Sequence, residues 1–300
     1  MDPKDLIVPP DFKSHWVESL SEEEYHADKT AMNSTLLRKM KKSPLTFKAH
    51  FDGLRDEETE SQKFGTMAHM VLLQGQKFWD KYRVMPEFIG LTKDGRESKQ
   101  SGEAREKKAA WLADLPPGCL VVTPEELDHL KGMVESLLRN KHALEVVQLS
   151  KPEVTGYYRD PVTGIKCRAR IDLLAMNLSC LGDLKTTKNC TPRAFMRSVY
   201  DEDYLYQIQL GMYDAAIKEI TGSAPELWTW IAIEKKPPYE VYVHEADPPT
   251  LEIGRWEYRR LMNRLKLCID TDNWPGVQSV IEVSSTPNHI IQEYQLKGVL

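Results

Sequence analysis

The segment 163–187, TGIKCRARIDLLAMNLSCLGDLKTT, constrains the fold more than any other part of the chain. Two short runs of alternating apolar and polar residues meet at a polar turn around Asn177 and Ser179. This alternation is typical of β-strands, and a polar turn between two such runs indicates a β-hairpin. We therefore expect a central β region, which extends over about 153–187.

Two carboxylates and one lysine lie on this hairpin. Side chains two apart on a strand point to the same face, so Asp183 and Lys185 would share a site, with Leu184 buried behind them. If the two strands pair, Asp172 at the end of the first strand reaches the same site. Carboxylates bind hard cations such as Mg²⁺, and an adjacent ammonium can orient water or stabilise charge on a phosphate. The arrangement suits a hydrolytic Mg²⁺ centre that acts on phosphodiesters.

The spacing of Asp183 and Lys185 is weak support on its own. An acidic residue two positions before a lysine also occurs elsewhere in the chain, at Asp2–Lys4, Asp11–Lys13, Glu97–Lys99, Glu106–Lys108 and Glu234–Lys236. None of these pairs follows a β-type run with an upstream Ile-Asp. The context of the hairpin, and not the spacing, favours a catalytic role.

Size and composition bound the class of protein. The chain has 300 residues, 41% hydrophobic and 28% charged, which suits one large α/β domain or two small ones in a globular protein. No run approaches the roughly 18 apolar residues of a membrane span. The start, MDPKDLIVPPDFK, lacks the pattern of a secretory signal, so a cytoplasmic protein without a membrane partner is expected. The net charge of −5 neither supports nor excludes binding to nucleic acid. The basic runs at 38–48 and 105–108 could contact phosphate, but they are equally typical of solvated helix faces.

Five cysteines stand at positions 119, 167, 180, 190 and 268, without a CxxC motif or a paired short spacing. This pattern argues against a structural zinc site, an iron–sulfur cluster and a disulfide framework. We expect buried or half-buried thiols.

Helical periodicity dominates the first third of the chain. A helix is expected over about 33–51, with Asn33 as an N-cap candidate and an interruption at Pro44. A second helix over about 60–75 carries His69. A lone histidine on a mostly apolar helix is usually structural, so spacing alone does not make His69 a metal ligand.

The rest of the chain alternates between strands and helices. The polar segment 90–108 predicts a mobile loop that runs into a helix ending near Ala113. Further elements are expected as strands at 119–123, 228–235 and 239–245, as helices at 124–140, 204–221 and 250–269, as a short helix after Thr191 and as an irregular tail after Trp274. The pattern predicts an α/β fold in one domain, with a mixed central β-sheet flanked by helices.

Six stretches occur in an order that resembles a known family. They are YHADKTAMNSTLLRKMKKSPLTF, FGTMAHMVLL, GYYRDPVTGIKCRARIDLL, GDLKTT, QLGMY and TDNWP. Together they resemble the PD-(D/E)XK nuclease domain of RecE-type exonucleases (exodeoxyribonuclease VIII-like) of phages and prophages. The resemblance covers about residues 25–276, which leaves 1–24 as an N-terminal extension and 277–300 as a C-terminal tail.

The resemblance implies an activity and partners. Such enzymes degrade linear double-stranded DNA from its ends, in the 5′ to 3′ direction, with Mg²⁺ as the cofactor and Mn²⁺ as a substitute. The 3′ single-stranded overhangs that remain serve a single-strand annealing recombinase. Related enzymes assemble as homo-oligomeric rings that thread DNA, so the resemblance implies such a ring here.

The site residues of the family carry over to matching positions. Its histidine corresponds to His69, its first aspartate to Asp172 and its D-x-K motif to Asp183-Leu184-Lys185. The implied metal ligands are the side chains of His69, Asp172 and Asp183 and the carbonyl of Leu184. The implied role of Lys185 is to orient or help deprotonate the attacking water.

Further residues are candidates by the same resemblance. Its Q-x-x-x-Y motif corresponds to Gln209 and Tyr213, which lie i, i+4 on one helix face and would contact DNA or Lys185. Glu153 aligns with an acidic position before the hairpin. Three roles stay open for it: a metal ligand, a base that contacts the metal ligands rather than the metal, or a surface glutamate without a role in the site. The nucleic-acid-binding candidates are Arg38 for a terminal 5′-phosphate, Arg168 and Arg170 for phosphate or the carboxylates, and Thr186 and Thr187 for backbone phosphate.

Three alternatives stay open. A nuclease of the same superfamily can act on single strands or cut internally, although many of those relatives hold an iron–sulfur cluster with cysteines that this chain lacks. A non-catalytic DNA-binding protein with a decayed site is disfavoured, because every expected catalytic residue type is present. An unrelated acid-rich protein with chance motifs would bind neither DNA nor a divalent metal.

Overall fold

A six-stranded mixed β-sheet forms the centre of the molecule. The computed structural model describes residues 2–17, 20–277, 292 and 295–296. The strands lie in the order β1 (His15–Val17), β6 (Lys151–Arg159), β7 (Lys166–Leu174), β8 (Cys180–Thr187), β9 (Leu227–Glu234) and β10 (Val241–Glu245). β8 and β9 are parallel, and the other neighbouring pairs are antiparallel. The predicted mixed sheet and its hairpin β7–β8 are confirmed.

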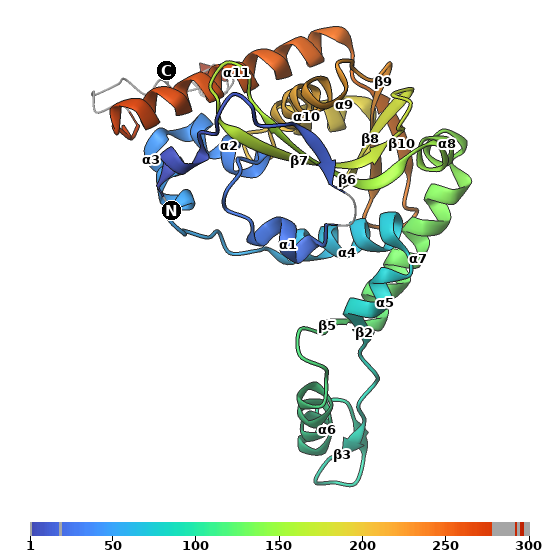
Figure 1. Ribbon diagram of the computed structural model, residues 1–300. Coiled ribbons are helices and arrows are strands. Elements are labelled where there is room, and N and C mark those ends of the chain that lie inside the picture. The colour runs from blue at the N-terminus through green and yellow to red at the C-terminus, as the bar shows by residue number, and fades with distance from the viewer. Residues whose placement is uncertain (1, 18–19, 278–291, 293–294, 297–300) are drawn as a thin grey trace.

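Helices cover both faces of the sheet and bury two hydrophobic cores (Figure 1). Trp228 and Trp230 of β9 belong to the first core, under α2, α3, α9, α10 and α11. Ile231 and Ile233 belong to the second core, under α4, α7 and α8. Alternate residues of β9 thus face opposite cores, as expected for a strand buried on both faces.

The helices of the described chain have the following bounds: η1 (Pro3–Leu6), α1 (Glu22–Ala27), α2 (Ser34–Lys42), α3 (Pro44–Phe51), α4 (Glu60–Gln74), α5 (Lys77–Lys81), α6 (Gly102–Ala113), α7 (Pro124–Arg139), α8 (Lys141–Leu149), α9 (Pro192–Val199), α10 (Tyr206–Thr221) and α11 (Pro248–Thr271). Four short strands lie outside the central sheet: β2 (Tyr82–Val84), β3 (Gly90–Leu91), β4 (Glu97–Ser98) and β5 (Leu120–Val122). No described helix is both long and apolar enough to cross a membrane.

The helix predicted over 33–51 consists of α2 and α3. Asn33 caps α2, where its Oδ1 accepts a hydrogen bond of 2.8 Å from the Leu36 N–H. Ser43 is extended, ends α2 and caps α3. The break lies there because Pro44 cannot continue the first helix but is favoured at the start of the second.

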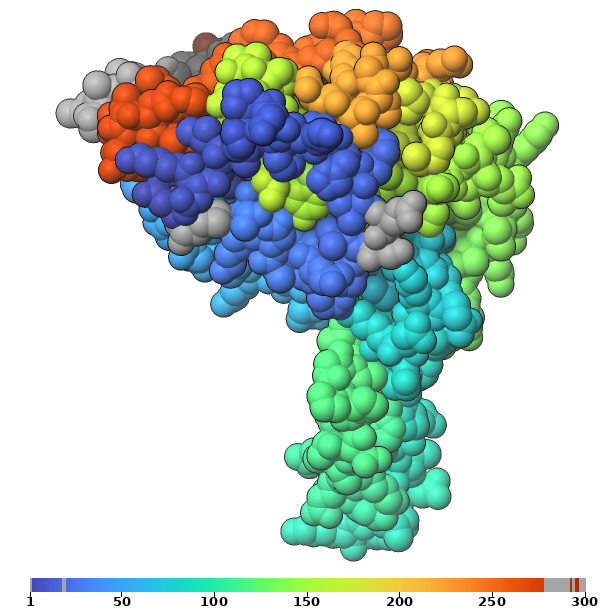
Figure 2. Space-filling model, in the orientation of Figure 1, coloured from blue at the N-terminus to red at the C-terminus, as the bar shows by residue number. Residues whose placement is uncertain are grey.

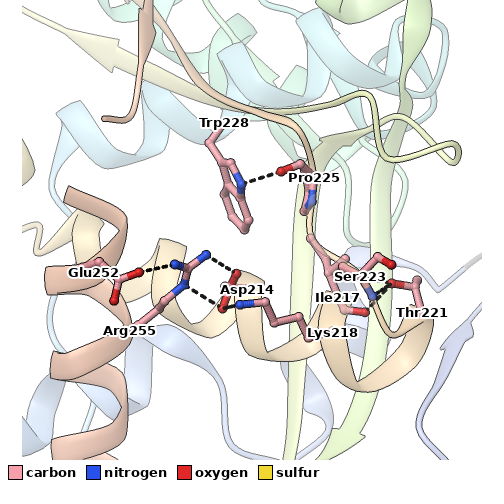
Figure 3. Close-up of polar contacts among 9 residues, drawn as sticks. All are labelled: Asp214, Ile217, Lys218, Thr221, Ser223, Pro225, Trp228, Glu252 and Arg255. Atoms are coloured by element: carbon pink, nitrogen blue, oxygen red, sulfur yellow. Dashed lines mark hydrogen bonds and ion pairs between the residues drawn. The ribbon is translucent and has the colours of Figure 1, made fainter. Parts of the chain in front are cut away.

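The helices α10 and α11 cross at two glycines. A Cβ atom on either Gly211 or Gly254 would overlap the backbone of the other helix, so the crossing requires glycine on both. Beside the crossing, Arg255 donates hydrogen bonds of 3.0 and 2.9 Å to Asp214, and Lys218 donates one of 2.8 Å (Figure 3). This packing fixes α10, which carries the Q-x-x-x-Y motif.

An arm projects from the body between α5 and α7 (Figures 1 and 2). The parallel pair β2–β5 forms its base, and the hairpin β3–β4 with α6 forms its tip. The segment 90–108, predicted as a mobile loop, is instead this hairpin and the first half of α6. The predicted end of the helix at Ala113 is confirmed.

Several short elements carry no clear sequence pattern, namely β1, α1, α5 and α8. β1 belongs to the segment 1–24, and it pairs with β6 at the edge of the sheet. The predicted tail 277–300 lies outside the described residues except at 277, 292 and 295–296. The structure buries four of the five cysteines and leaves Cys119 half-buried.

Candidate metal centre

Three carboxylates lie in one row across neighbouring strands. The antiparallel register of β6 and β7 places Glu153 opposite Asp172, and the register of β7 and β8 places Asp172 opposite Asp183. The first ladder skips this position, and the second ends one step before it, at Leu173 and Gly182. The sheet therefore opens at the carboxylate row, which frees backbone groups and side chains for a site.

The backbone at Glu153 accompanies this opening. Glu153 has a φ of +55°, in the left-handed region where a residue with a side chain is strained. On β7, the two residues that flank Asp172 face different sides of the sheet: Ile171 faces the first core, and Leu173 faces the second. Side chains two apart share a face on a regular strand, so β7 is irregular here. Backbone strain of this kind is concentrated at functional sites.

His69 approaches the row from α4. Its Nδ1 lies 3.4 Å from Asp172 Oδ2. The helix comes close to β8 at Gly65, where a Cβ atom would lie 3.3 Å from Thr186 Oγ1. Burial and the Lys185 ammonium lower the pKa of His69. The imidazole is therefore neutral near pH 7 and offers a lone pair to a metal.

The carboxylates of the row destabilise one another when ionised. Burial and the charge of Asp183 raise the pKa of Asp172 to about 7, although the Leu184 N–H donates a hydrogen bond of 2.8 Å to Asp172 Oδ2. Burial and the charge of Asp172 also raise the pKa of Glu153. A divalent cation in the row would offset both effects, because an opposite charge favours the ionised carboxylates.

The donor set suits a divalent metal. Within the described part of the chain, one ligand atom from each of His69, Glu153 and Asp172 lies within 4.8 Å of the others. The N–H and C=O of one strand residue point to the same side. The Leu184 carbonyl therefore lies on the side of β8 from which the Leu184 N–H reaches Asp172. Carboxylate and carbonyl oxygens suit Mg²⁺ and Mn²⁺, so these four groups fit such an ion.

Asp183 lies in the row but is not one of the three side chains whose ligand atoms lie within 4.8 Å of one another, and its role as a metal ligand stays a prediction. Its Oδ2 forms an ion pair with Lys185 Nζ. Burial opposes the charged form of Lys185, but Asp183 and Asp172 outweigh burial and raise the pKa of the ammonium. Leu184 is fully buried in the second core, on the other side of the strand. The strand thus holds a charged lysine beside the proposed metal ligands.

The two residues of the Q-x-x-x-Y motif hold the Asp183 carboxylate through hydrogen bonds. The Tyr213 hydroxyl lies 3.3 Å from Asp183 Oδ1 and 2.8 Å from the Arg170 carbonyl, and Gln209 Nε2 donates to it at 2.6 Å. Gln209 and Tyr213 thus lie on one face of α10 and contact each other. Tyr213 is only 2% exposed. It cannot contact DNA directly, and it positions Asp183 instead.

The two arginines of β7 are used inside the protein. Arg170 forms an ion pair with Glu153, as one of its two predicted roles requires. Arg168 is 3% exposed, pairs with Asp28 and lies 4.5 Å over the Tyr25 ring of α1. This burial does not agree with the predicted contact of Arg168 with nucleic acid.

Three other predicted DNA contacts are more accessible. Arg38, Thr186 and Thr187 are half-buried. Burial lowers the pKa of Arg38, and its guanidinium donates a hydrogen bond to the carbonyl of Tyr204, two residues before α10 begins at Tyr206. Thr186 and Thr187 directly follow Lys185 on β8.

Tyr206 belongs to the site but was not singled out from the sequence. Lys185 Nζ lies 4.8 Å from the centroid of its ring. Tyr206 stands three residues before Gln209 on α10, so the i, i+3 neighbour relation on a helix could have identified it.

A second group of ligand-type residues has different chemistry. Cys190, Glu234 and Glu240 offer atoms within 4.8 Å of one another. Glu234 Oε1 accepts a hydrogen bond of 3.0 Å from the Cys190 N–H. Burial and Glu234 raise the pKa of the Cys190 thiol to about 11, which disfavours the thiolate that binds metals.

The fold and the carboxylate row with its D-x-K motif define a protein of the PD-(D/E)XK nuclease class. The fold is similar to that of a solved structure, a "putative exonuclease" from Eubacterium rectale, with 12% identity over 92% of this chain and 98% of that chain and a TM-score of 0.59. At this identity the likeness shows the fold alone. Another structure, of SSO0001, covers 83% of this chain and 99% of its own at 16% identity, but its TM-score of 0.28 supports no argument.

Residues 33–285 match a family described as a PDDEXK-like domain of unknown function, DUF3799. The chain belongs to this family. The predicted membership of the PD-(D/E)XK nuclease superfamily is confirmed at that level. The comparison with curated proteins finds no match.

Proposed function

We propose that the protein is a Mg²⁺-dependent exodeoxyribonuclease that degrades linear double-stranded DNA from its ends, in the 5′ to 3′ direction, and leaves 3′ single-stranded overhangs for recombination. Mn²⁺ would replace Mg²⁺. One observation carries the proposal: Glu153, Asp172 and Asp183 lie in one row where β7 and β8 separate, with Lys185 and His69 beside them. The family supports a nuclease, and the resemblance to RecE-type enzymes supports the action on DNA ends.

Each group has a role in this proposal. His69, Glu153, Asp172 and the Leu184 carbonyl would hold the ion, which supplies positive charge to activate water and to stabilise the scissile phosphate. Lys185 orients the water for attack in line with the leaving oxygen. Asp183 keeps the Lys185 ammonium in place and, as the third carboxylate of the row, would be a further ligand of the ion.

Five residues around the row would bind DNA or position the site. Tyr213 and Gln209 fix the Asp183 carboxylate through the contacts described above. Arg38, a half-buried guanidinium, would contact a terminal 5′-phosphate. Thr186 and Thr187, which follow Lys185 on β8, would donate hydrogen bonds to the DNA backbone.

End-labelled DNA tests the proposal directly. A linear duplex with or without a 5′-phosphate, and a closed circle of the same sequence, would be incubated in Mg²⁺ and in EDTA. We expect release of nucleotides from the 5′ label of the linear duplex in Mg²⁺, and an intact circle. Cleavage of the circle would favour the alternative of an internally cutting nuclease, and digestion of single strands alone would favour the single-strand-specific one.

Variants of the site show whether the cleavage comes from this protein or from a contaminating nuclease. Asp183→Ala and Lys185→Ala should each reduce cleavage by at least about a hundredfold while the fold is retained. Lys218→Ala is the matched control, because Lys218 pairs with Asp214 on α10 and lies outside the row. Full activity of either site variant would refute the assignment.

The resemblance also supports two assemblies. Overhangs left by the enzyme would pass to a single-strand annealing recombinase, which co-purification in the presence of resected DNA would detect. A homo-oligomeric ring would sediment clearly faster than a single 34.5 kDa chain, whereas a monomer at micromolar concentration would contradict it.

A further inference from the structure

The turn before α10 presents a tyrosine at the edge of the site. The backbone N–H groups of Tyr204 and Leu205 both donate to the Asp201 carbonyl, at 3.0 and 2.8 Å. Leu205 is buried in the first core and has a φ of +48°, a strained left-handed conformation for a residue with a side chain. The turn is therefore fixed from inside, while Tyr204 remains 47% exposed.

The ring of Tyr204 is joined to the catalytic lysine through one other ring. The rings of Tyr204 and Tyr206 have centroids 5.4 Å apart at an interplanar angle of 36°. Tyr206 in turn lies 4.8 Å below Lys185 Nζ. Two aromatic rings thus lead from the lysine beside the carboxylate row to the surface.

A guanidinium completes this edge. Arg38 of α2 donates a hydrogen bond to the Tyr204 carbonyl, and its Nη2 lies 3.3 Å from Thr35 Oγ1. Arg38 is thereby held next to Tyr204 rather than free to move with solvent. A positive charge beside an exposed aromatic face is the combination that binds a nucleotide strand, where the charge attracts phosphate and the ring stacks on a base.

Packing does not explain the exposure of Tyr204. Its hydroxyl forms no hydrogen bond within the described part of the chain, whereas those of Tyr157, Tyr200 and Tyr239 contact Asp28, Thr250 and His129. The ring of Tyr204 is half-exposed, lies on a strained turn at the edge of the site, and has a hydroxyl without a hydrogen bond within the described residues. Its face is therefore available to a ligand.

We propose that Tyr204, supported by Tyr206 and flanked by Arg38, is the stacking platform for a nucleobase close to the scissile phosphate at the DNA end. The inference rests on the proposed function, because it assumes that DNA occupies the carboxylate row. Every base has a π-face, so the platform accepts any sequence. It would hold the base after it has left the duplex stack and so keep its phosphate at Lys185.

A double-mutant cycle between protein and DNA tests the contact. The change on the protein is Tyr204→Ala, and the change on the DNA is an abasic nucleotide placed at the first, second or third position from the 5′ end. Binding is measured by fluorescence anisotropy of a linear duplex labelled at its far end, in EDTA. We expect each single change to weaken binding between about five- and a hundredfold, as for one lost base stack. At the position of the stacked base, combining Tyr204→Ala with the abasic nucleotide should weaken binding no more than either change alone.

Two further variants control the measurement. Tyr204→Phe keeps the ring and should bind as the wild type does. Tyr242→Ala removes a tyrosine of similar exposure, 45%, from β10 and should leave binding unchanged. In Mg²⁺, Tyr204→Ala should raise KM with kcat nearly unchanged, because the stack is present in both the bound substrate and the transition state.

The outcomes distinguish the inference from the proposed function. If the wild type cleaves DNA ends but the two losses add at all three positions, Tyr204 is not the platform, and the nuclease assignment stands. If coupling is found but Mg²⁺ supports no cleavage, the platform stands and the nuclease assignment falls. A wild type that neither binds the duplex nor cleaves it in Mg²⁺ overturns both.

Discussion

At the residue scale, Glu153 combines three unfavourable features. Its backbone is left-handed, its carboxylate is largely buried, and the neighbouring charge of Asp172 raises its pKa. Arg170 offsets part of this, through the ion pair. A glutamate that only contributed to the strand would be replaced without loss, so the combination indicates a residue kept for its ligand atoms.

A comparison of two substitutions tests the strain at Glu153. Alanine is normally more stable than glycine within a strand, because glycine loses more conformational freedom on folding. At φ +55° the order should reverse, since glycine adopts this conformation without strain. We expect Glu153→Gly to be more stable than Glu153→Ala by about 1 kcal/mol in urea unfolding. The usual order would contradict a strained backbone.

The same two variants report on the metal. Both lack the carboxylate, so both should bind Mn²⁺ at least about tenfold more weakly in calorimetric titration, whatever their stability. Unchanged Mn²⁺ affinity in both variants would exclude Glu153 as a metal ligand. His69 and Asp172 would then remain as the neighbouring candidate ligands.

At the element scale, the crossing of α10 and α11 couples stability to the site. Gly211 lies between Gln209 and Tyr213, so a displaced α10 also displaces the support of Asp183. Gly211→Ala should lower the free energy of unfolding by about 1–3 kcal/mol, because its methyl group would overlap the backbone at Gly254. Cleavage should fall with it at temperatures where the variant is still folded.

A second glycine provides the control for this prediction. Gly102 begins α6, and a Cβ atom there has nothing within 4 Å. Gly102→Ala should leave cleavage unchanged and change stability by less than about 1 kcal/mol, in the stabilising direction. Equal destabilisation by both substitutions would show that the crossing is not what requires Gly211.

The junction of α1 with the sheet has a defined pH dependence. Burial would raise the pKa of Asp28, but hydrogen bonds from Tyr157 and Thr30 and the charge of Arg168 outweigh it and lower the pKa to about 2. The unfolded value is about 3.9. The depressed pKa stabilises the fold above pH 4, and this contribution is lost as the pH falls from about 4 to about 2.

Urea unfolding between pH 5 and pH 2 measures this contribution. After allowance for solvent screening, Asp28 accounts for about 1–2 kcal/mol of the loss in the wild type. Asp28→Asn has no such group, so it should be less stable at pH 5 and lose correspondingly less on acidification. Parallel pH profiles for the two proteins would exclude the assignment.

The sequence was most informative where periodicity is strong and local. The hairpin β7–β8, the helices α4 and α10, and the Asp183–Lys185 pair all follow from spacing along one element. The direction of the Asp183 carboxylate does not, because it depends on Lys185 and on Tyr213 of another element. Likewise, Arg168 is covered by Tyr25 of α1 and by Asp28, which follows it, and α1 is six residues long with no extended pattern.

The row itself shows what spacing cannot give. Glu153, Asp172 and Asp183 meet because the registers of two strand pairs coincide at one level. Register is set by tertiary packing and turn geometry, and a slip of one residue would turn the side chains to the other face. The left-handed backbone at Glu153 carries no sequence signal, since glutamate rarely adopts it.

At the scale of the whole molecule, the arm differs from the body. Between residues 85 and 119, only Gly90, Ser101 and Ala104 are buried. Apolar side chains there, Ile89, Leu91 and Leu112, are 38 to 57% exposed. The segment carries six acidic and six basic residues, so it has no excess positive charge to attract DNA. Its own interior is too small to stabilise it as the central sheet is stabilised.

Hydrogen exchange should show this difference. Local opening free energies follow the local burial of apolar contacts, so the amides of α6 should exchange at least about a thousandfold faster than those of β8 in dilute protein. If copies of the chain assemble through the exposed apolar residues of the arm, protection of α6 should rise with protein concentration while that of β8 stays constant. Protection of α6 equal to that of β8 at every concentration would contradict this description, because the described contacts of the arm cannot supply it.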